Sequence, residues 1–135
     1  MADRIIRRFV PLRLTLGRDR AEVRRFGLFW TPTLYVLDHT GTPRAESVGY
    51  LPPEETLAFL DFGEAQVLLR RGRLNEAAAL FKGIAEERPG SGFAPDALYW
   101  AAIARYLASG NHADLDRYRA ELRRRYPDSL AARKV

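Results

Sequence analysis

Apolar and polar positions alternate near the start of the chain, over Phe9–Leu16. One face of an extended strand there carries Val10, Leu12, Leu14 and Leu16. This period of two predicts a β-strand that ends at Gly17. Pro11 has no amide to donate, so we expect an edge strand or a bulge.

A second pair of segments predicts a β-hairpin. Thr33–Leu37 is a compact apolar run, and Pro43–Val48 is a more polar one. The turn sequence Asp38-His39-Thr40-Gly41 lies between them, as expected for two antiparallel strands.

Helix signals surround these strands. Ala2–Arg8 is a candidate short basic helix. Asp19 with Glu22 three residues later resembles a capping box, opening a helix that stops at Gly27. A longer helix begins at Pro53, with proline in its first turn and carboxylates near its positive end. Gly63 within it indicates a kink or a hinge.

The second half of the chain repeats itself. Gly72 to Pro89 and Gly110 to Pro127 both span 17 positions, and the second pair is offset from the first by 38. The units resemble tetratricopeptide repeats, in which small residues let paired helices approach and larger ones fill the seam. The framework positions are Ala65, Leu68, Gly72, Ala77, Phe81 and Pro89 in the first unit, and Tyr106, Gly110 and Pro127 in the more degenerate second unit.

A further resemblance lies in the first half, over about residues 9 to 62. The run from Phe26 to Leu34, the turn from Asp38 to Gly41, and Val48-Gly49-Tyr50 are similar to the second half of thioredoxin-like proteins. The resemblance implies a cis peptide bond between Thr31 and Pro32, in a loop with Trp30 that contacts bound peptide in that family.

The chain departs from this family in its chemistry and in its sheet. The family's first strands and the helix with Cys-x-x-Cys would precede Phe9, where only eight residues stand. A central strand between Phe9–Leu16 and Thr33–Leu37 is then missing too, and unpaired strand edges would be exposed. Either Phe9–Leu16 moves in beside Thr33–Leu37, or a second copy completes the sheet as a homodimer.

Together these patterns predict an α+β chain in two parts. Residues 1–62 form a partial thioredoxin-like β-α-β-β-α unit, and residues 63–135 form a tetratricopeptide-like array of helical hairpins.

Composition limits the chemistry. The chain has no cysteine, which excludes disulfides, thiol catalysis and cysteine-ligated metals. We expect His39 and His112 to be solvated, the adjacent pair Glu54-Glu55 to complement a helix start, and Arg123-Arg124-Arg125 to complement a helix end. No catalytic residue, metal site or cofactor is predicted.

The sequence therefore favours a non-catalytic scaffold that binds a protein or peptide, with a concave groove in the helical repeats. The candidate partner contacts are Phe29, Trp30, Tyr99 and Trp100. An alternative is a fragment or short-start form of a redox protein whose Cys-x-x-Cys lies upstream of Met1. A second alternative is a nucleic-acid or acidic-surface binder, less favoured because acids are interleaved with the bases that give the net charge of +5. We find no membrane span or signal peptide, so a cytoplasmic location is the default expectation.

Overall fold

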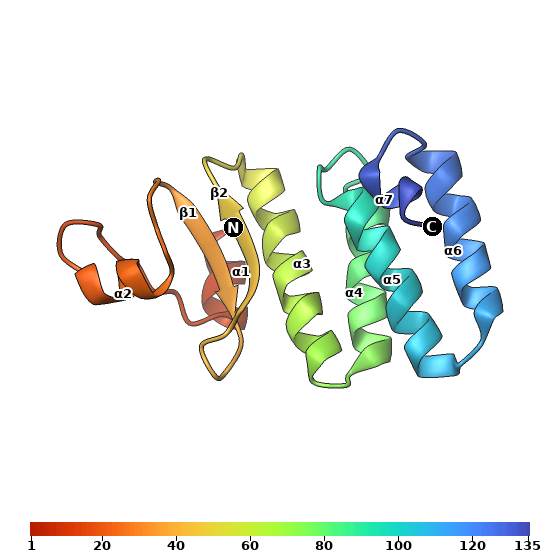
Figure 1. Cartoon of the computed structure of the whole chain (residues 1–135), viewed down its shortest axis with the longest axis horizontal. Helices are drawn as coiled ribbons and strands as arrows, with labels where there is room; N and C mark the ends of the chain where they lie inside the picture. The colour runs from red at the N-terminus through yellow and green to blue at the C-terminus, as the bar shows by residue number, and fades with distance from the viewer.

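The computed structural model describes all 135 residues as one small hairpin beside a row of helices (Figure 1). The two strands are β1 (Thr33–Leu37) and β2 (Pro43–Val48). The helices are α1 (Ala2–Arg8), α2 (Arg20–Arg25), α3 (Pro53–Arg70), α4 (Leu74–Glu87), α5 (Ala94–Ser109), α6 (His112–Arg125) and α7 (Leu130–Arg133). None of the helices combines the length and the apolar composition needed to cross a membrane.

The predicted hairpin is present. β1 and β2 are antiparallel and in register from Thr33 opposite Val48 to Val36 opposite Ala45, with an irregularity after Val36. Asp38 holds the turn: one carboxylate oxygen accepts hydrogen bonds from the Thr40 hydroxyl (2.6 Å) and amide (2.9 Å) and from the Thr42 amide (3.0 Å). The hydroxyl of Thr40, the two amides and Arg44 hold the pKa of Asp38 well below its usual range.

Helix α3 packs against the hairpin at Gly63. The helix is continuous from Pro53 to Arg70, so Gly63 is neither a break nor a boundary between two helices. Its role is close approach: a Cβ built on Gly63 would lie 2.4 Å from a methyl carbon of Val36. Val36 is the one buried residue of the hairpin. Because α3 also packs against α4, one helix is shared by both parts of the molecule.

The second half consists of two helical hairpins, α3 with α4 and α5 with α6. The turns between paired helices contain Gly72 (φ +77°) and Gly110 (φ +69°), both in the left-handed region that glycine adopts without strain. Small residues at the helix crossings are fully buried, among them Ala65 and Ala77, and Phe81 fills the seam between them. These packed helices supply the hydrophobic core.

Phe9–Leu16 is not a strand, and this prediction is wrong. The segment is irregular, with Val10 97% exposed and Leu12 78% exposed. The alternation is real, but no neighbouring strand pairs with it, so neither its backbone nor its apolar face is buried. It also does not move in beside β1, because the sheet has only two strands.

The capping box predicted at Asp19 is also absent. Asp19 precedes α2, but its side chain makes no cap hydrogen bond with that helix. Its carboxylate turns back and accepts from the Thr15 amide (2.6 Å), which closes the turn before the helix. The Asp19 carboxylate therefore bonds to the Thr15 amide in place of an amide in the first turn of α2.

Candidate protein-interaction surface

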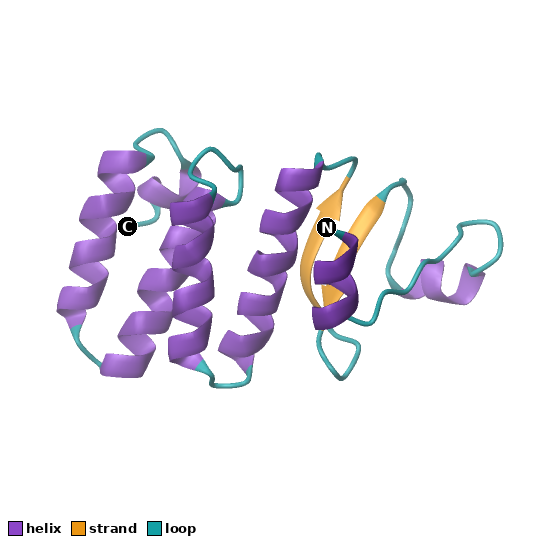
Figure 2. Cartoon of the chain, turned by 180° about the vertical axis from the view of Figure 1, so that it is seen from behind, coloured by secondary structure: helices purple, strands orange, loops and turns teal.

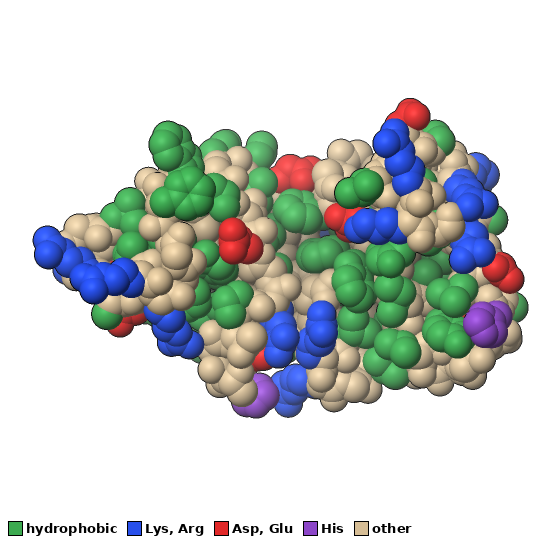
Figure 3. Space-filling model, in the orientation of Figure 1, with side chains coloured by type: hydrophobic (Ala, Val, Ile, Leu, Met, Phe, Trp, Pro, Cys, Tyr) green, Lys and Arg blue, Asp and Glu red, His purple; other side chains and the backbone are tan.

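The loop that leads into β1 presents two large aromatic side chains to solvent. Phe29 is 83% exposed and Trp30 is 61% exposed. The Thr33 hydroxyl donates to the Trp30 carbonyl (2.8 Å), and the Thr31–Pro32 peptide bond is cis. Tyr50, 75% exposed, follows β2 at the same end of the hairpin, because Thr33 pairs with Val48. Apolar side chains gather at this end of the hairpin in Figure 3.

A shallow cleft of about 290 Å³ lies between α2 and the hairpin face that is turned away from α3. Its walls are Arg25, Phe26, Tyr35, Gly41, Thr42, Pro43 and Glu46. The Phe26 and Tyr35 rings pack 5.1 Å apart, and the Tyr35 hydroxyl donates to the Phe26 carbonyl (3.2 Å). Burial raises the pKa of Tyr35, and Glu46 raises it further. The Arg25 guanidinium lies over Phe26 and donates to the Gly41 carbonyl (3.4 Å), without an acidic partner.

The outer edge of β1 is open. The Gly49 amide donates to the Pro32 carbonyl (2.8 Å). In an antiparallel pair, residues that bond to the neighbouring strand alternate with residues whose backbone groups point outward, so this bond determines which residues of β1 are which. Leu34 and Val36 therefore exchange hydrogen bonds with β2. The backbone groups of Thr33, Tyr35 and Leu37 point to the other side, where no strand is present.

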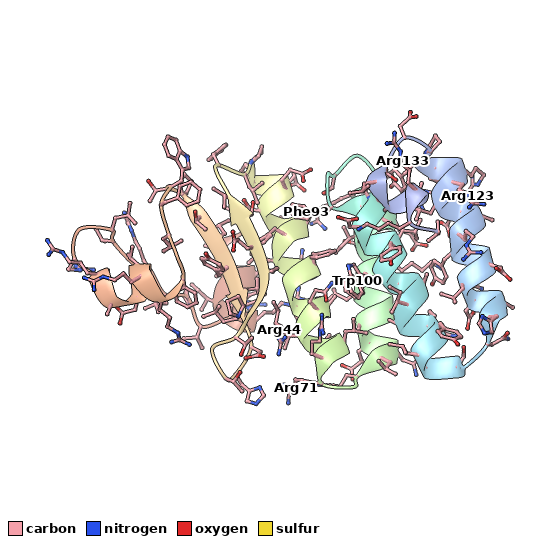
Figure 4. The ribbon with its side chains drawn as sticks, viewed as in Figure 1. Arg44, Arg71, Phe93, Trp100, Arg123 and Arg133 are labelled. Atoms are coloured by element: carbon pink, nitrogen blue, oxygen red, sulfur yellow. The ribbon has the colours of Figure 1, made fainter.

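The aromatic residues predicted on the helical part are tied into its core. Trp100 stacks on buried Phe81 (6.5 Å between ring centroids), and Tyr99 packs edge-on against Trp100. The Lys134 amine lies 5.3 Å from the Tyr99 ring. Both side chains are half-buried on α5. Figure 4 labels Trp100 among the side chains of the helical part.

The four candidate contacts therefore do not form one site. α5 packs on α4 and touches α3, but it does not contact the hairpin. Phe29 and Trp30 are free at one end of the molecule, whereas Tyr99 and Trp100 are half-covered at a distance from them. The exposed pair is the stronger candidate.

The repeat-framework residues take structural positions. Leu68 is half-buried against the core, Tyr106 is half-buried on α5, and Pro89 and Pro127 are exposed in the turns that follow α4 and α6. With the buried alanines, Phe81 and the two turn glycines, they support the helices.

One cluster that the sequence did not reveal joins α1 to α3. Asp61 on α3 is only 3% exposed. Arg4 donates to both of its carboxylate oxygens (2.6 and 2.7 Å) and Arg8 donates to one (3.0 Å). Arg8 also pairs with Glu64. Arg88, at the end of α4, brings a guanidinium nitrogen within 3.6 Å of Asp61.

These ion pairs hold α1 in place, crossing in front of the hairpin in Figure 2. The helix makes no close backbone contact with any other element. The signal in the sequence is an acid, Asp61, between the apolar residues Leu60 and Phe62 of a core helix, with several arginines near the start of the chain.

Other predicted polar residues have local partners. Glu55 accepts from the Ser91 hydroxyl (2.9 Å) and the Gly92 amide (3.2 Å), which ties the start of α3 to the loop after α4. Arg125 donates to the Ala85 carbonyl (2.6 Å). His39 lies exposed in the hairpin turn, and His112 lies beside Tyr106, 3.5 Å from its hydroxyl. No group of three or more histidines and acids is arranged to hold a metal ion.

Comparison with known proteins finds a similarity in the first half of the chain. The family model of the thioredoxin-like domain matches residues 3–64. A search of curated proteins found no match, and a search of solved structures found none either. The matched region contains the hairpin, the cis Thr31–Pro32 bond and the exposed loop, so the candidate surface lies in the part of the chain that is similar to a thioredoxin-like domain, and the chain has no cysteine.

Proposed function

We propose that this chain is a protein- or peptide-binding module in which a thioredoxin-like hairpin presents the contact surface and a tetratricopeptide-like helical part supports it. The observation that carries the proposal is the exposure of Phe29 and Trp30 beside the open edge of β1. Tryptophan in particular is enriched among residues that dominate binding energies.

The size of the exposed apolar surface supports this function. A Phe, Tyr or Trp side chain buries about 150–250 Å² when it is covered. Phe29, Trp30 and Tyr50, at 61–83% exposure, therefore expose on the order of 400 Å² together. The largest exposed apolar patch on a soluble protein is typically about 300–600 Å² and is often functional.

The helical part has the properties of a support. Its core joins α3 through α7, and α3 packs directly on the hairpin through Gly63 and Val36. Tyr99 and Trp100 contribute mainly to this support, since each packs on another core side chain or on Lys134.

The proposed function is non-catalytic. Disulfide exchange needs a thiolate, and this chain has no cysteine. We expect the pure protein to reduce insulin disulfides no faster than buffer with dithiothreitol. Measurable turnover would contradict the non-redox assignment.

The binding function can be tested with peptide libraries. Phage-displayed random peptides are selected on the immobilised wild type and counter-selected on the bare support. Selected peptides are then measured by fluorescence anisotropy. A tryptophan hot spot is worth at least about 2 kcal/mol, so the double variant should bind about 30-fold more weakly.

The matched control is Leu107→Ala, which removes a 55% exposed apolar side chain from α5. It should leave the affinity unchanged. Equal affinity of the double variant and the wild type would refute the proposed surface, and a loss confined to Trp100→Ala would move the site to the helical part.

A further inference from the structure

The two outer edges of the hairpin differ in chemistry. On β2, the backbone groups that point outward belong to Arg44, Glu46 and Val48, and Pro43 stands at the start of the strand. Charged residues and proline are the devices by which proteins keep a sheet edge from pairing with another strand. The edge of β2 is therefore protected.

The edge of β1 has none of these devices. Its sequence, Thr-Leu-Tyr-Val-Leu, has no charge, no proline and no glycine, and all five residues favour or tolerate extended backbone. Such an edge is typical of a strand that is paired on both sides.

We propose that β1 pairs antiparallel with β1 of a second copy of this chain, giving a continuous four-stranded sheet in the order β2-β1-β1-β2. The outer edge of β1 can pair with the same edge of a second copy, with Tyr35 at the centre of the pairing. With Tyr35 opposite Tyr35 of the other copy, Thr33 lies opposite Leu37 at both ends, and the outward backbone groups of all three residues are paired.

The side chains fit this register. Thr33, Tyr35 and Leu37 lie on the same face of β1, so the two tyrosines form a cross-strand aromatic pair and each Leu37, now 38% exposed, gains a neighbour.

Charge sets how this dimer responds to salt. Residues 1–52 contain nine arginines and five acids, a net charge of +4, whereas β1 itself is uncharged. Two copies therefore repel through the surrounding arginines and not through the pairing strand. Salt screens this repulsion, so the dimer should tighten as ionic strength rises.

The test is sedimentation equilibrium of the full chain from low to high micromolar concentration, with Leu37→Lys and Val48→Lys. Both variants add a lysine on the same face of the hairpin, but only Leu37 lies on the open edge. We expect the wild type to dimerise, Leu37→Lys to weaken the dimer at least tenfold, and Val48→Lys to leave the dissociation constant within about twofold. Circular dichroism confirms that each variant is folded.

Three results would overturn the proposal: a wild type that stays monomeric at high micromolar concentration and high salt, equal effects of the two lysines, or a dimer that weakens with salt. Amide hydrogen exchange gives an independent reading. The amides of Tyr35 and Leu37 should become protected as the protein is concentrated, and protection already present in a dilute monomer would also contradict pairing between copies. The peptide-binding function is judged separately, on Phe29→Ala/Trp30→Ala.

Discussion

The first 52 residues and the remaining 83 both have periodic apolar positions but reach different degrees of burial. Of the 24 buried residues, only Val36 precedes Pro53. In the helical part, alanines at the crossings let α3, α4 and α5 approach closely, and Phe81, Leu98 and Leu122 fill the space between them. In the first part, Val10, Leu12, Phe29 and Trp30 remain largely exposed.

The difference teaches that hydrophobic periodicity alone does not produce a core. A helix can bury its apolar stripe against a neighbour that follows in sequence, as α4 does against α3 and α5. A strand also needs a partner for its backbone. Phe9–Leu16 has the pattern of a strand but no such partner, and the edge of β1 is in the same position.

The largest effect is expected at the centre of the helical part. Phe81→Ala removes a fully buried ring that contacts Phe62 and Trp100, so we expect a loss of about 3–5 kcal/mol in the free energy of unfolding. Phe29→Ala, at 83% exposure, should change it by less than about 0.5 kcal/mol. Urea unfolding followed by circular dichroism measures both. Similar losses would contradict the difference between the two parts.

The ion cluster is the next most sensitive point. Asp61→Asn leaves Arg4 and Arg8 without their shared carboxylate, and we expect a loss of about 2–3 kcal/mol. The readout specific to α1 is limited trypsin digestion, in which the variant should be cut after Arg4, Arg7 or Arg8 faster than the wild type. Asp96→Asn, on the exposed first turn of α5, is the control. An unchanged cleavage rate would show that the ion pairs do not hold α1.

The contact between α3 and the hairpin leaves no room for a side chain at Gly63. Gly63→Ala places a methyl group against Val36, and we expect a cost of about 1–3 kcal/mol. Gly83→Ala is the matched control, because only the end of the Glu87 side chain lies within 4 Å, and in a helix interior this change should stabilise by up to about 1 kcal/mol. Adding Val36→Ala to Gly63→Ala should recover part of the loss. A neutral Gly63→Ala would contradict the close packing of α3 on the hairpin.

The smallest effect concerns pH and the hairpin turn. The pKa of Asp38 is lowered in the folded protein, so its contribution to stability is present above the unfolded value of about 3.9 and is lost as pH falls below it. Asp38→Asn should therefore reduce stability near neutral pH and flatten the acid dependence below about pH 4. Thermal melts of both proteins across this range make the comparison. If the melting temperatures of the two proteins change with pH in parallel, Asp38 does not contribute to the pH dependence of stability.

The elements that could be predicted from sequence are those stabilised by local signals. The hairpin follows from its turn residues, the two helical hairpins follow from Gly72 and Gly110, and α3 follows from Pro53 and its acidic first turn. Each signal acts over a few residues. The thioredoxin-like resemblance rested on such a local run, and the family match covers the same region.

The features that could not be predicted depend on residues far apart in sequence. Asp61 and Arg4 are separated by 57 positions, and Gly63 and Val36 meet only when α3 lies on the hairpin. Phe9–Leu16 failed as a strand for the same reason, because a period of two says nothing about whether a partner strand exists. The sequence also could not separate the four candidate contact residues by exposure: Phe29 and Trp30 are exposed, whereas Tyr99 and Trp100 are half-buried against other side chains.

The most direct test of this account is hydrogen exchange with mass spectrometry on dilute wild-type protein, compared between β1 with its preceding loop and α4 with α5. Amides of α4 and α5 should exchange only through global unfolding, and those of residues 9–37 should exchange orders of magnitude faster through local opening. Such a result would show that residues 9–37 have no core or strand partner of their own and that the helical part is stable. Equal protection of the two regions would contradict it, because residues 9–37 would then have a core or a strand partner of their own.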